Sequence, residues 1–456
     1  MIKPVKLSTL LIIFLMFTII SCGEKKIATS TPTPIIPTQT PEPSHTPMAS
    51  DTPTITPTNA PLYNTTATVV PNESQPLFLV HYMPWYQAPP VDTAWGWHWT
   101  MNHFMPDIKD ENGRRQIASH FYPLTGPYDS RDPDILEYQV LLLKLSGIDG
   151  VIVDWYGTEN SYDYATLNDS TNALFNYVKK AGLLFSICYE DQTIRIMIDN
   201  NHIPKEDARS NAQKEMLYLQ NTWFRDDAYL RTSEQPVLFV FGPQYFKSAS
   251  DWQTIFSVLN TAPVFISEDN TVPPVTASSY PWPPMWASQN GVLTEQTLES
   301  YLTSFYKKSA NWKYWVGSAF PGFEDIYKEA GVSEGYGYLD ARDGESFKQT
   351  LQLALDNNPN AIQLVTWNDY GEGTNIEPTI EYGYQYLRII QDTIRASINP
   401  DFNYTVDDLA IPYQIYQLRK QYSEDASVNA QLDQVFELIV SGDLAGAKAI
   451  LTQITG

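Results

Sequence analysis

The sequence predicts an α/β fold: a (β/α)8 TIM barrel followed by a short C-terminal helical tail. Two observations carry this prediction. Eight short apolar runs, rich in β-branched and aromatic residues, follow one another between residues 76 and 368, and segments with helical periodicity separate most of them. Near-continuous apolar strands that alternate with helices over ~320 residues favour a closed parallel barrel. An open doubly wound sheet is the alternative that this pattern leaves open.

The predicted strands share an apolar run that ends in polar or aromatic residues, and they cover residues 76–83, 149–156, 183–190, 236–242, 262–268, 283–288, 313–320 and 361–368. The predicted helices cover residues 132–147, 164–182, 205–223, 293–310 and 344–359. Several helices open on Asp, Ser or Thr and close on Gly or Asn, which are capping residues. After about residue 399, two or three short amphipathic helices follow within 413–454, and we see no function in them.

The N-terminal residues predict export and a lipid anchor. Lys3 and Lys6 precede an apolar run at residues 7–20, which is short for a membrane span but suits the core of a signal peptide. The run ends in SCGEKK and resembles a bacterial lipoprotein signal, in which cleavage leaves a lipidated Cys22 as the new N-terminus. An ordinary signal peptide or an uncleaved anchor is the alternative. With Cys22 lipidated, only Cys188 remains, so no intramolecular disulfide is expected.

The chain therefore divides into four predicted parts: a lipoprotein signal peptide at 1–22, a disordered Thr/Pro-rich stalk at 23–75, the barrel at 76–398 and the helical tail at 399–456. The stalk is nearly free of aromatic residues and cannot bury enough apolar area to offset the cost of ordering. At ~3 Å per residue, it would hold the barrel on the order of 100 Å from the membrane. The predicted location is the cell surface, lipid-anchored to the membrane.

Composition excludes several classes of partner. The chain has 52 acidic and 29 basic side chains, a net charge of −23, so no nucleic acid is expected. Its 12 Trp and 29 Tyr suit a neutral, polar ligand such as a polysaccharide or oligosaccharide. The six histidines form no HExxH motif or Cys/His cluster, and GxSxG, phosphate-loop and dinucleotide motifs do not occur. We therefore expect no metal and no cofactor, and we expect a monomer.

Polar and aromatic residues gather after the predicted strands, where a parallel barrel builds its active site. Carbohydrate sites combine aromatic faces that stack on sugar rings with carboxylates and amides that bind hydroxyls. A single Asp or Ser in such a place is more often a helix N-cap, so the argument rests on joint occurrence. The candidate substrate-binding residues are Tyr82, Trp85, Tyr86, Trp97, His98, Trp99, Asp154, Trp155, Glu190, Gln244, Trp286, Asn368 and Tyr370.

Two carboxylates lie close together after the last predicted strand, Asp369 and Glu372 in LVTWNDYGEG. Glycoside hydrolysis needs two carboxyl groups, one to protonate the departing oxygen and one to act as base or nucleophile. If a helix begins here, the two residues are offset by one turn and can point to the same side. Gly371 and Gly373 permit an irregular backbone that would aim both into the barrel mouth. The competing interpretation is that Asp369 only caps a helix whose first turn contains Glu372.

The strand ends resemble glycoside hydrolase families 99 and 71 over about residues 76–397. HYMPWY followed by WGWHW resembles the first-strand signature of family 99, and GIDGVIVDWYG resembles its second strand. SAFPGFED is similar to its seventh-strand loop, and ARDGESF to the segment before strand eight. TWNDYGEGTNIEP aligns with the family 99 pattern Asn-Glu-Trp-His-Glu-Gly-Thr-x-Ile-Glu-Pro, while its start, TWNDYGE, matches family 71 almost letter for letter.

The resemblance implies an α-glycoside hydrolase, because family 99 comprises retaining endo-α-mannosidases and family 71 inverting α-1,3-glucanases. By position, Glu372 matches the family 99 general acid/base. Asp369 takes the place of a partner Glu that is thought to deprotonate the sugar 2-hydroxyl and give a 1,2-anhydro-sugar intermediate. Asp is shorter by about 1.5 Å, which would admit the water that inversion requires. Stereochemistry stays open with a slight preference for inversion, and the substrate stays open between α-mannan, α-glucan and another α-linked polysaccharide.

We therefore expect a surface-tethered glycoside hydrolase that uses Glu372 and Asp369 in general acid/base catalysis. A non-catalytic carbohydrate-binding lipoprotein on the same barrel is the alternative from another class, and the presence of both acids disfavours it. A sugar transferase is disfavoured because no nucleotide-sugar phosphate site occurs. Asn368 would orient a carboxylate, and Glu377 would either do the same or pair with a barrel arginine such as Arg342.

Overall fold

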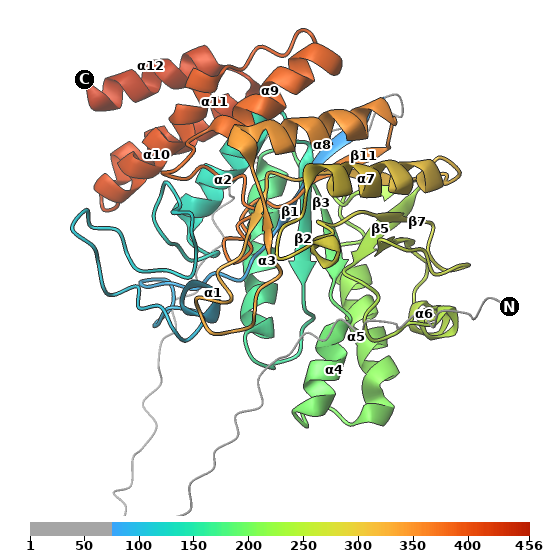
Figure 1. Ribbon diagram of the computed structural model, residues 1–456. Helices are drawn as coiled ribbons and strands as arrows, with labels where there is room; N and C mark the ends of the chain where they lie inside the picture. Colours follow the sequence, from blue (N-terminus) through green and yellow to red (C-terminus); the bar gives the residue numbers. More distant parts are fainter. Residues whose placement is uncertain (1–74) are drawn as a thin grey trace, which may run out of the picture. The chain divides into compact units, whose positions relative to one another are not determined.

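Eight parallel strands form a nearly closed barrel at the centre of the structure (Figure 1). This computed structural model describes residues 75–456, so the predicted signal peptide, Cys22 and the predicted stalk up to residue 74 lie outside the described residues. The barrel strands are β1 (Leu77–Tyr82), β2 (Gly150–Trp155), β3 (Leu184–Tyr189), β5 (Gln235–Val240), β6 (Val264–Glu268), β7 (Ser278–Tyr280), β8 (Val316–Ala319) and β11 (Ala361–Leu364). The last strand, β11, pairs in parallel with the first, so the predicted (β/α)8 barrel is confirmed and an open sheet is excluded.

The barrel has a seam between β7 and β8, which share no strand ladder. One side-chain contact crosses it, because Ser318 Oγ of β8 donates to the Pro281 carbonyl just after β7 (2.8 Å). Because β7 and β8 are both short, few backbone groups can pair across the seam. The Ser318 hydroxyl therefore takes the place of a backbone donor for the Pro281 carbonyl.

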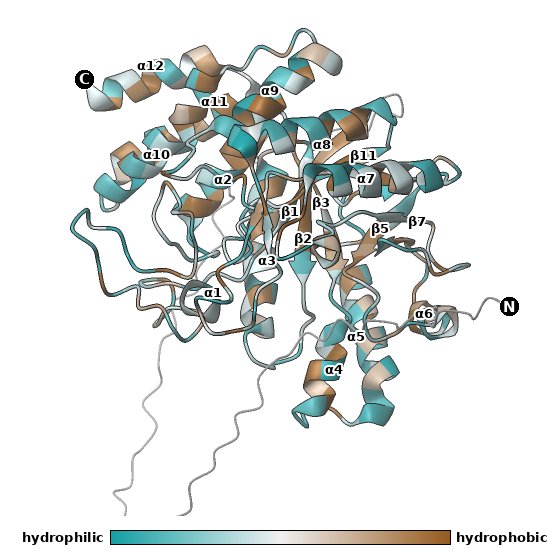
Figure 2. Cartoon of the chain, in the orientation of Figure 1, coloured by the Kyte–Doolittle hydropathy of each residue, from teal (hydrophilic) through white to brown (hydrophobic). Residues whose placement is uncertain are grey.

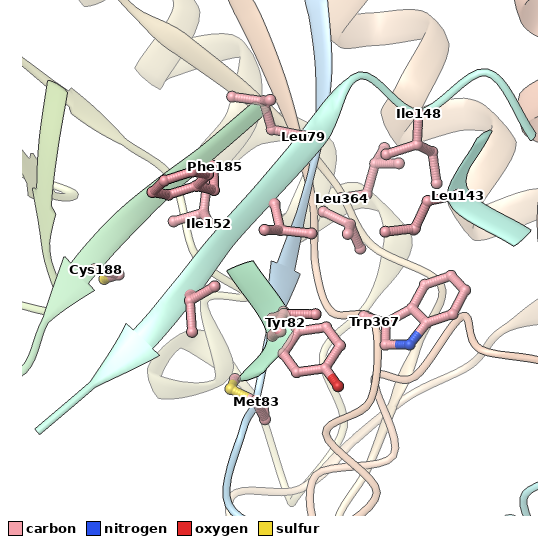
Figure 3. Packing of buried hydrophobic residues seen from close by; sticks show 14 of the residues in the cluster. Leu79, Tyr82, Met83, Leu143, Ile148, Ile152, Phe185, Cys188, Leu364 and Trp367 are labelled. Carbon is pink, nitrogen blue, oxygen red and sulfur yellow. The ribbon is translucent and has the colours of Figure 1, made fainter. Parts of the chain in front are cut away.

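Side chains alternate between the barrel interior and the surrounding helices along each strand. On β1, Tyr82 points outward and its hydroxyl donates to Gln139 Oε1 of α2 (Pro133–Ser146; 2.6 Å). His81 points inward, where its Nδ1 meets Gln363 Oε1 of β11 (3.3 Å). Figure 3 shows Tyr82 among the buried apolar side chains, with Trp367 beside it. The same alternation decides which strand-end residues can reach a ligand.

Helices form the outer layer, and Figure 2 shows largely hydrophobic strands surrounded by helices that carry both hydrophobic and hydrophilic residues. After α2 come α3 (Tyr164–Lys180), α4 (Gln192–Asp199), α5 (Ala208–Thr222), α6 (Ala249–Phe256), α7 (Glu295–Ser309), α8 (Glu345–Asp356) and α9 (Gln385–Ser397). The sequence prediction contained α2, α3, α5, α7 and α8 but missed α4, α6 and α9. No helix at residues 75–456 combines the length and the apolar character that crossing a membrane requires.

The prediction of the sixth strand was wrong. Residues 283–288 begin with two prolines, which cannot donate to a ladder, and Met285–Ala287 form a single 3₁₀ turn. The sixth barrel strand is instead β7, the polar run Ser278–Tyr280, which pairs with β6. Trp286 therefore lies in the loop after a strand rather than in one.

Three C-terminal helices pack together on one side of the barrel, against α2 (Figure 1). They are α10 (Ala410–Gln421), α11 (Ala426–Ser441) and α12 (Leu444–Thr455). Arg419 of α10 joins the layers, since its guanidinium bonds to Glu137 of α2 through two N–H groups (2.9 and 2.8 Å) and to Asp433 of α11 (2.7 Å). Glu137 is buried, so losing its partner would leave an uncompensated charge.

Candidate active site

The loop after β11, residues 365–378, carries both predicted catalytic carboxyls at the C-terminal end of the barrel. It forms a tight turn and not a helix. The Glu372 N–H donates to Asp369 Oδ1 (2.9 Å), and the Asp369 N–H donates to Thr366 Oγ1 (2.8 Å). The Glu324 N–H donates to the Glu372 carbonyl (2.9 Å), which ties the turn to the loop after β8. Asp369 thus caps a turn, as the competing interpretation had it, while the same turn brings the two acids together.

Gly373 is the residue that allows this turn. Its φ is +66°, a conformation that other residues rarely adopt, and a Cβ atom there would lie 2.6 Å from the Glu324 carbonyl oxygen. A side chain at this position would push the turn away from the loop after β8.

Both carboxyls have raised pKa values. Burial raises the pKa of Asp369 to about 6, although the N–H groups of Glu372 and Gly371 partly oppose the shift. Burial, followed by the negative charges of Asp369 and Asp325, raises the pKa of Glu372 well above its ordinary value. Within the pair, Asp369 is therefore the group that ionises more readily and Glu372 the group that holds its proton more strongly. Such a split assigns a base and an acid.

Asn368 fixes the position of this loop against the first strand. Its Oδ1 accepts from the Met83 N–H (2.8 Å) and its Nδ2 donates to the Met83 carbonyl (2.9 Å), so the amide mimics a strand neighbour. Nδ2 also donates to the Tyr128 hydroxyl (3.1 Å). Asn368 is fully buried, and both ends of its side chain are engaged in protein contacts. It anchors backbone and does not face a ligand, contrary to its prediction as a substrate-binding residue.

Glu377 is a structural carboxyl. It accepts from Gln139 (2.7 Å), from the Tyr128 hydroxyl (2.8 Å) and from the Tyr370 hydroxyl (2.8 Å). Burial raises the pKa of Glu377 to about 7. The expected pairing with Arg342 was wrong, because Arg342 bonds to Glu295 on the outer helix α7 (2.7 Å).

An aromatic stack stands at the mouth where the first strand ends. The ring of Trp85 stacks on the imidazole of His98, with centroids 4.2 Å apart and planes at 7°. Trp97 meets the same imidazole in an edge-on arrangement, with centroids 5.0 Å apart. Burial lowers the pKa of His98 to about 3, so its contact with Asp163 (3.9 Å) is not an ion pair at neutral pH. A neutral imidazole can donate one hydrogen bond and accept another, which suits a sugar hydroxyl.

Five predicted substrate-binding aromatics lie too deep to touch a ligand, and they are corrected here. Tyr82 bonds to α2, and Trp155 faces the outer layer, where its Nε1–H donates to Asn168 (3.1 Å) and its ring stacks on Tyr218. The remaining three form a buried cluster that supports the first-strand loop: Tyr86, Trp99 and Tyr370. Aromatic residues after a strand look alike in sequence, but the direction of the side chain depends on the alternation along the strand.

Asp154 and Glu190, predicted to hold hydroxyls, both face the interior at neighbouring strand ends. Burial raises the pKa of Glu190 to about 7, and burial together with the charge of Glu190 raises that of Asp154 well above its ordinary value. Gln244 lies at the end of β5, where its N–H donates to Asp191 (2.7 Å), and its side chain is half-buried.

Trp286 is 64% exposed and meets Tyr301 edge-on (6.1 Å). The Tyr301 hydroxyl donates to Asp269, which directly follows β6. The tryptophan therefore lies on the side of the barrel where the strands end, outside the ring of carboxyls.

Two acids that the sequence prediction omitted, Glu268 and Asp325, contribute to the electrostatics of the mouth. Glu268 ends β6, and burial with the charge of Asp269 raises its pKa to about 8. Asp325, which follows β9 (Phe323–Glu324), accepts from the N–H groups of Tyr327 (3.2 Å) and Tyr336 (2.7 Å) and raises the pKa of Glu372. The signal for both acids was their place directly after a strand.

Comparisons with known proteins agree with this barrel. The family model described as glycosyl hydrolase family 99 matches residues 75–268, which run from β1 to the end of β6. A glycoprotein endo-alpha-1,2-mannosidase-like protein of Danio rerio is 22% identical over 342 residues, covering 66% of this chain and 70% of its own length. The glycoprotein endo-alpha-1,2-mannosidase of Mus musculus is 23% identical over 325 residues, covering 66% and 67%.

A solved structure shares the fold. The GH99 endo-alpha-mannosidase of Bacteroides thetaiotaomicron superposes with a TM-score of 0.52 at 20% sequence identity, over 72% of this chain and 99% of that one. Its complex with bis-tris-propane gives a TM-score of 0.53. The family model covers the first five barrel strands, the curated relatives span two thirds of the chain, and the solved structure shares the fold over 72% of it. The matched family model and relatives support a glycoside hydrolase similar to family 99.

Proposed function

We propose that this protein is a surface-tethered hydrolase of α-linked polysaccharide, an α-mannan or an α-glucan, with Glu372 as general acid and Asp369 as its partner. One observation carries the proposal: the hydrogen bond from the Glu372 N–H to Asp369 Oδ1 (2.9 Å) joins a half-buried and a buried acid in one turn at the barrel mouth. Burial and the negative charge of Asp369 raise the pKa of Glu372, which favours Glu372 as the proton donor and Asp369 as the ionised partner.

Glu372 suits the acid role because no hydrogen bond engages its carboxyl among the described residues, and it is only half-buried. It can therefore donate its proton to the departing glycosidic oxygen. Asp369 Oδ1 accepts from the Glu372 N–H, which leaves Oδ2 for chemistry. That oxygen would take a proton either from the sugar 2-hydroxyl, as in the family 99 route, or from a water.

The two candidate sugars rest on different features. The matched relatives carry the name endo-alpha-1,2-mannosidase, which favours an α-mannan. The stretch TWNDYGE resembles family 71, which favours an α-glucan. The neutral His98 stacked on Trp85 suits either one, because it offers an aromatic face and hydroxyl partners without a charge.

The test is a panel of α-mannans and α-glucans assayed for release of reducing ends. We expect turnover on one class, and a loss of ~10²–10⁴-fold in kcat for both Glu372→Gln and Asp369→Asn. Glu424→Gln, at an exposed site in the turn between α10 and α11, is the matched control and should keep wild-type rates. Wild-type rates in both active-site variants, or tight binding with no release of reducing ends by the wild type, would refute the proposal.

The anomer of the first product, followed by NMR, separates the two roles of Asp369. Retention assigns it the 2-hydroxyl and an anhydro-sugar intermediate, whereas inversion assigns it the attacking water. Wild-type protein and the polysaccharide that gives turnover are sufficient for this measurement.

Tethering rests on the sequence SCGEKK and the Thr/Pro-rich segment that follows it. We expect the wild type in the membrane fraction and Cys22→Ser in the soluble fraction, with equal specific activity, since Cys22 precedes the barrel. Equal distribution of the two would refute the lipid anchor. A single peak at the mass of one chain in size-exclusion chromatography would agree with the monomer that we propose.

A further inference from the structure

The interior of the barrel holds three potential metal ligands on three adjacent strands. His81 of β1, Asp154 of β2 and Cys188 of β3 all occupy inward-facing positions, and Asp154 and Cys188 are direct neighbours in the sheet. One ligand atom from each lies within 4.8 Å of the other two, and all three side chains are buried. Barrel interiors are ordinarily filled with branched apolar residues, so a histidine, a carboxylate and a thiol together need an explanation.

The orientation of His81 leaves one ring nitrogen free for a ligand. Its Nδ1 lies 3.3 Å from Gln363 Oε1, and an amide oxygen can only accept, so Nδ1 carries the hydrogen. The other nitrogen, Nε2, then presents a lone pair. A metal-binding histidine is held in the same way, by donating its second N–H to a carbonyl or carboxylate.

Asp154 provides an independent observation. It is 2% exposed, and neither of its oxygens has a donor in hydrogen-bond geometry among residues 75–456. Buried carboxyl groups nearly always have such partners, because leaving them without any is costly. The neighbouring Glu190 carboxyl can share a proton with Asp154, and a bound cation would take the place of that proton.

The surroundings favour a cation as well. The carboxyls of Glu190, Asp369 and Glu372 act on Asp154. None of these four acids forms an ion pair with a lysine or arginine in the described part of the chain. Bound protons therefore neutralise part of this group of acids, and a cation would displace them.

We propose that His81, Asp154 and Cys188 bind one zinc ion at the base of the active-site mouth. A nitrogen, a carboxylate oxygen and a sulfur are the donors that zinc accepts, and three protein ligands leave a fourth position for water. Ligand atoms around a tetrahedral zinc lie roughly 3.3–3.8 Å apart, so the 4.8 Å spread has to close by about 1 Å, which side-chain rotation permits. The three residues lie far apart along the chain and meet only in the barrel, so the sequence by itself did not group them.

Cobalt is the probe for this site, because a cobalt–thiolate bond gives a charge-transfer band in the near ultraviolet. The full-length chain is treated with a chelator and a reductant and then titrated with Co²⁺. We expect a band that saturates at one equivalent and disappears when one equivalent of Zn²⁺ is added. Native mass spectrometry should give a mass increase of one zinc ion per chain.

Two cysteine variants locate the ion. Cys188→Ser should lose the charge-transfer band, and Cys22→Ser, the only other cysteine of the chain, should keep it. Asp154→Asn retains the thiol and the shape of the site, and it should weaken Co²⁺ binding at least tenfold and abolish the rise in Tm that Zn²⁺ gives the wild type. If Cys188→Ser fails to fold, Asp154→Asn alone tests whether the ion binds at this site.

The proposal is wrong if the wild type shows no saturable thiolate band, or if Cys188→Ser keeps the band. It is also wrong if folded Asp154→Asn binds Co²⁺ as tightly as the wild type. None of these results depends on turnover of a polysaccharide, so the zinc site and the hydrolase function can fail separately.

Discussion

Glu372 and Glu377 lie in the same loop after β11, and both are glutamates whose pKa is raised by burial. Glu377 is 1% exposed and accepts three hydrogen bonds from neutral donors. The carboxyl of Glu372 is engaged by no donor among the described residues and reaches the mouth of the barrel. A raised pKa is therefore common to the two acids and does not identify the reactive one. The lone pairs of the Glu372 carboxyl, which accept no hydrogen bond among the described residues, identify Glu372 as the reactive acid, because a group that reacts must be free to bind the substrate.

The strongest test of this contrast uses the leaving group. A general acid matters most when the departing oxygen is a poor leaving group, so Glu372→Gln should lose ~10²–10⁴-fold in kcat on the natural polysaccharide. On an aryl glycoside with an acidic phenol, which leaves without protonation, the same variant should recover most of its activity. Asp369→Asn is the matched comparison and should stay inactive on both substrates, because its role does not depend on the leaving group. Equal losses for Glu372→Gln on the two substrates would contradict its role as acid.

Glu377→Gln should act on stability and spare the chemistry. Glutamine puts an NH₂ group among three donors that point at the carboxyl, and at least one of those donors loses its acceptor. We expect a decrease in the free energy of unfolding of about 1–3 kcal/mol, measured by urea denaturation, with kcat changed by less than a few-fold. Glu424→Gln should leave both unchanged. A kcat loss as large as that of Glu372→Gln would mean that Glu377 takes part in the reaction.

The sequence could predict the strand-eight acids because two features are local: the place after an apolar run and the short spacing between Asp369 and Glu372. It could also predict most of the barrel, since seven of the eight runs became strands. β7 was missed because its residues, Ser278–Tyr280, are neither apolar nor β-branched and are held in the sheet by their pairing with β6.

Side-chain direction is the part that sequence reasoning could not provide. Tyr82 and His81 are neighbours in one strand, yet one packs on α2 and the other faces the barrel interior. Asn368 looked like an orienting amide, but its partners lie in the first-strand loop, far away along the chain. Such contacts arise from tertiary packing, so a list of polar strand-end residues contains both ligands and structural partners.

The charge around Glu372 should be visible in the pH dependence of kcat/KM. Activity should rise through about pH 6 as Asp369 ionises, and fall at higher pH as Glu372 loses its proton. The negative charge of Glu268 raises the pKa of Glu372, so Glu268→Gln should lower that pKa and move only the alkaline limb, on the order of half a unit toward lower pH. Since no hydrogen bond engages the Glu268 carboxyl in the described part of the chain, the loop should keep its shape. A shift to higher pH, or a shift of the acidic limb, would contradict this electrostatic account.

The contrast between side chains that are held by protein partners and side chains that are free for a ligand also applies to the tryptophans. Here we expect the smallest effect of a substitution on the kinetics. Trp155 is fully buried and donates to Asn168, whereas Trp286 is 64% exposed and its ring meets Tyr301 edge-on. Trp286 lies beside Tyr301, whose hydroxyl donates to Asp269 directly after β6, so we expect it to contact a sugar unit distant from the cleaved bond. Trp286→Ala should therefore raise KM for a long polysaccharide about three- to tenfold through loss of one stacking platform, with little change in kcat. A short oligosaccharide that does not reach the rim should show no change in KM, since its sugar units are held by the inner wall of Trp85 and His98.

An equal KM effect on both substrates would place Trp286 next to the cleaved bond. No effect on either substrate would make Trp286 an ordinary exposed residue.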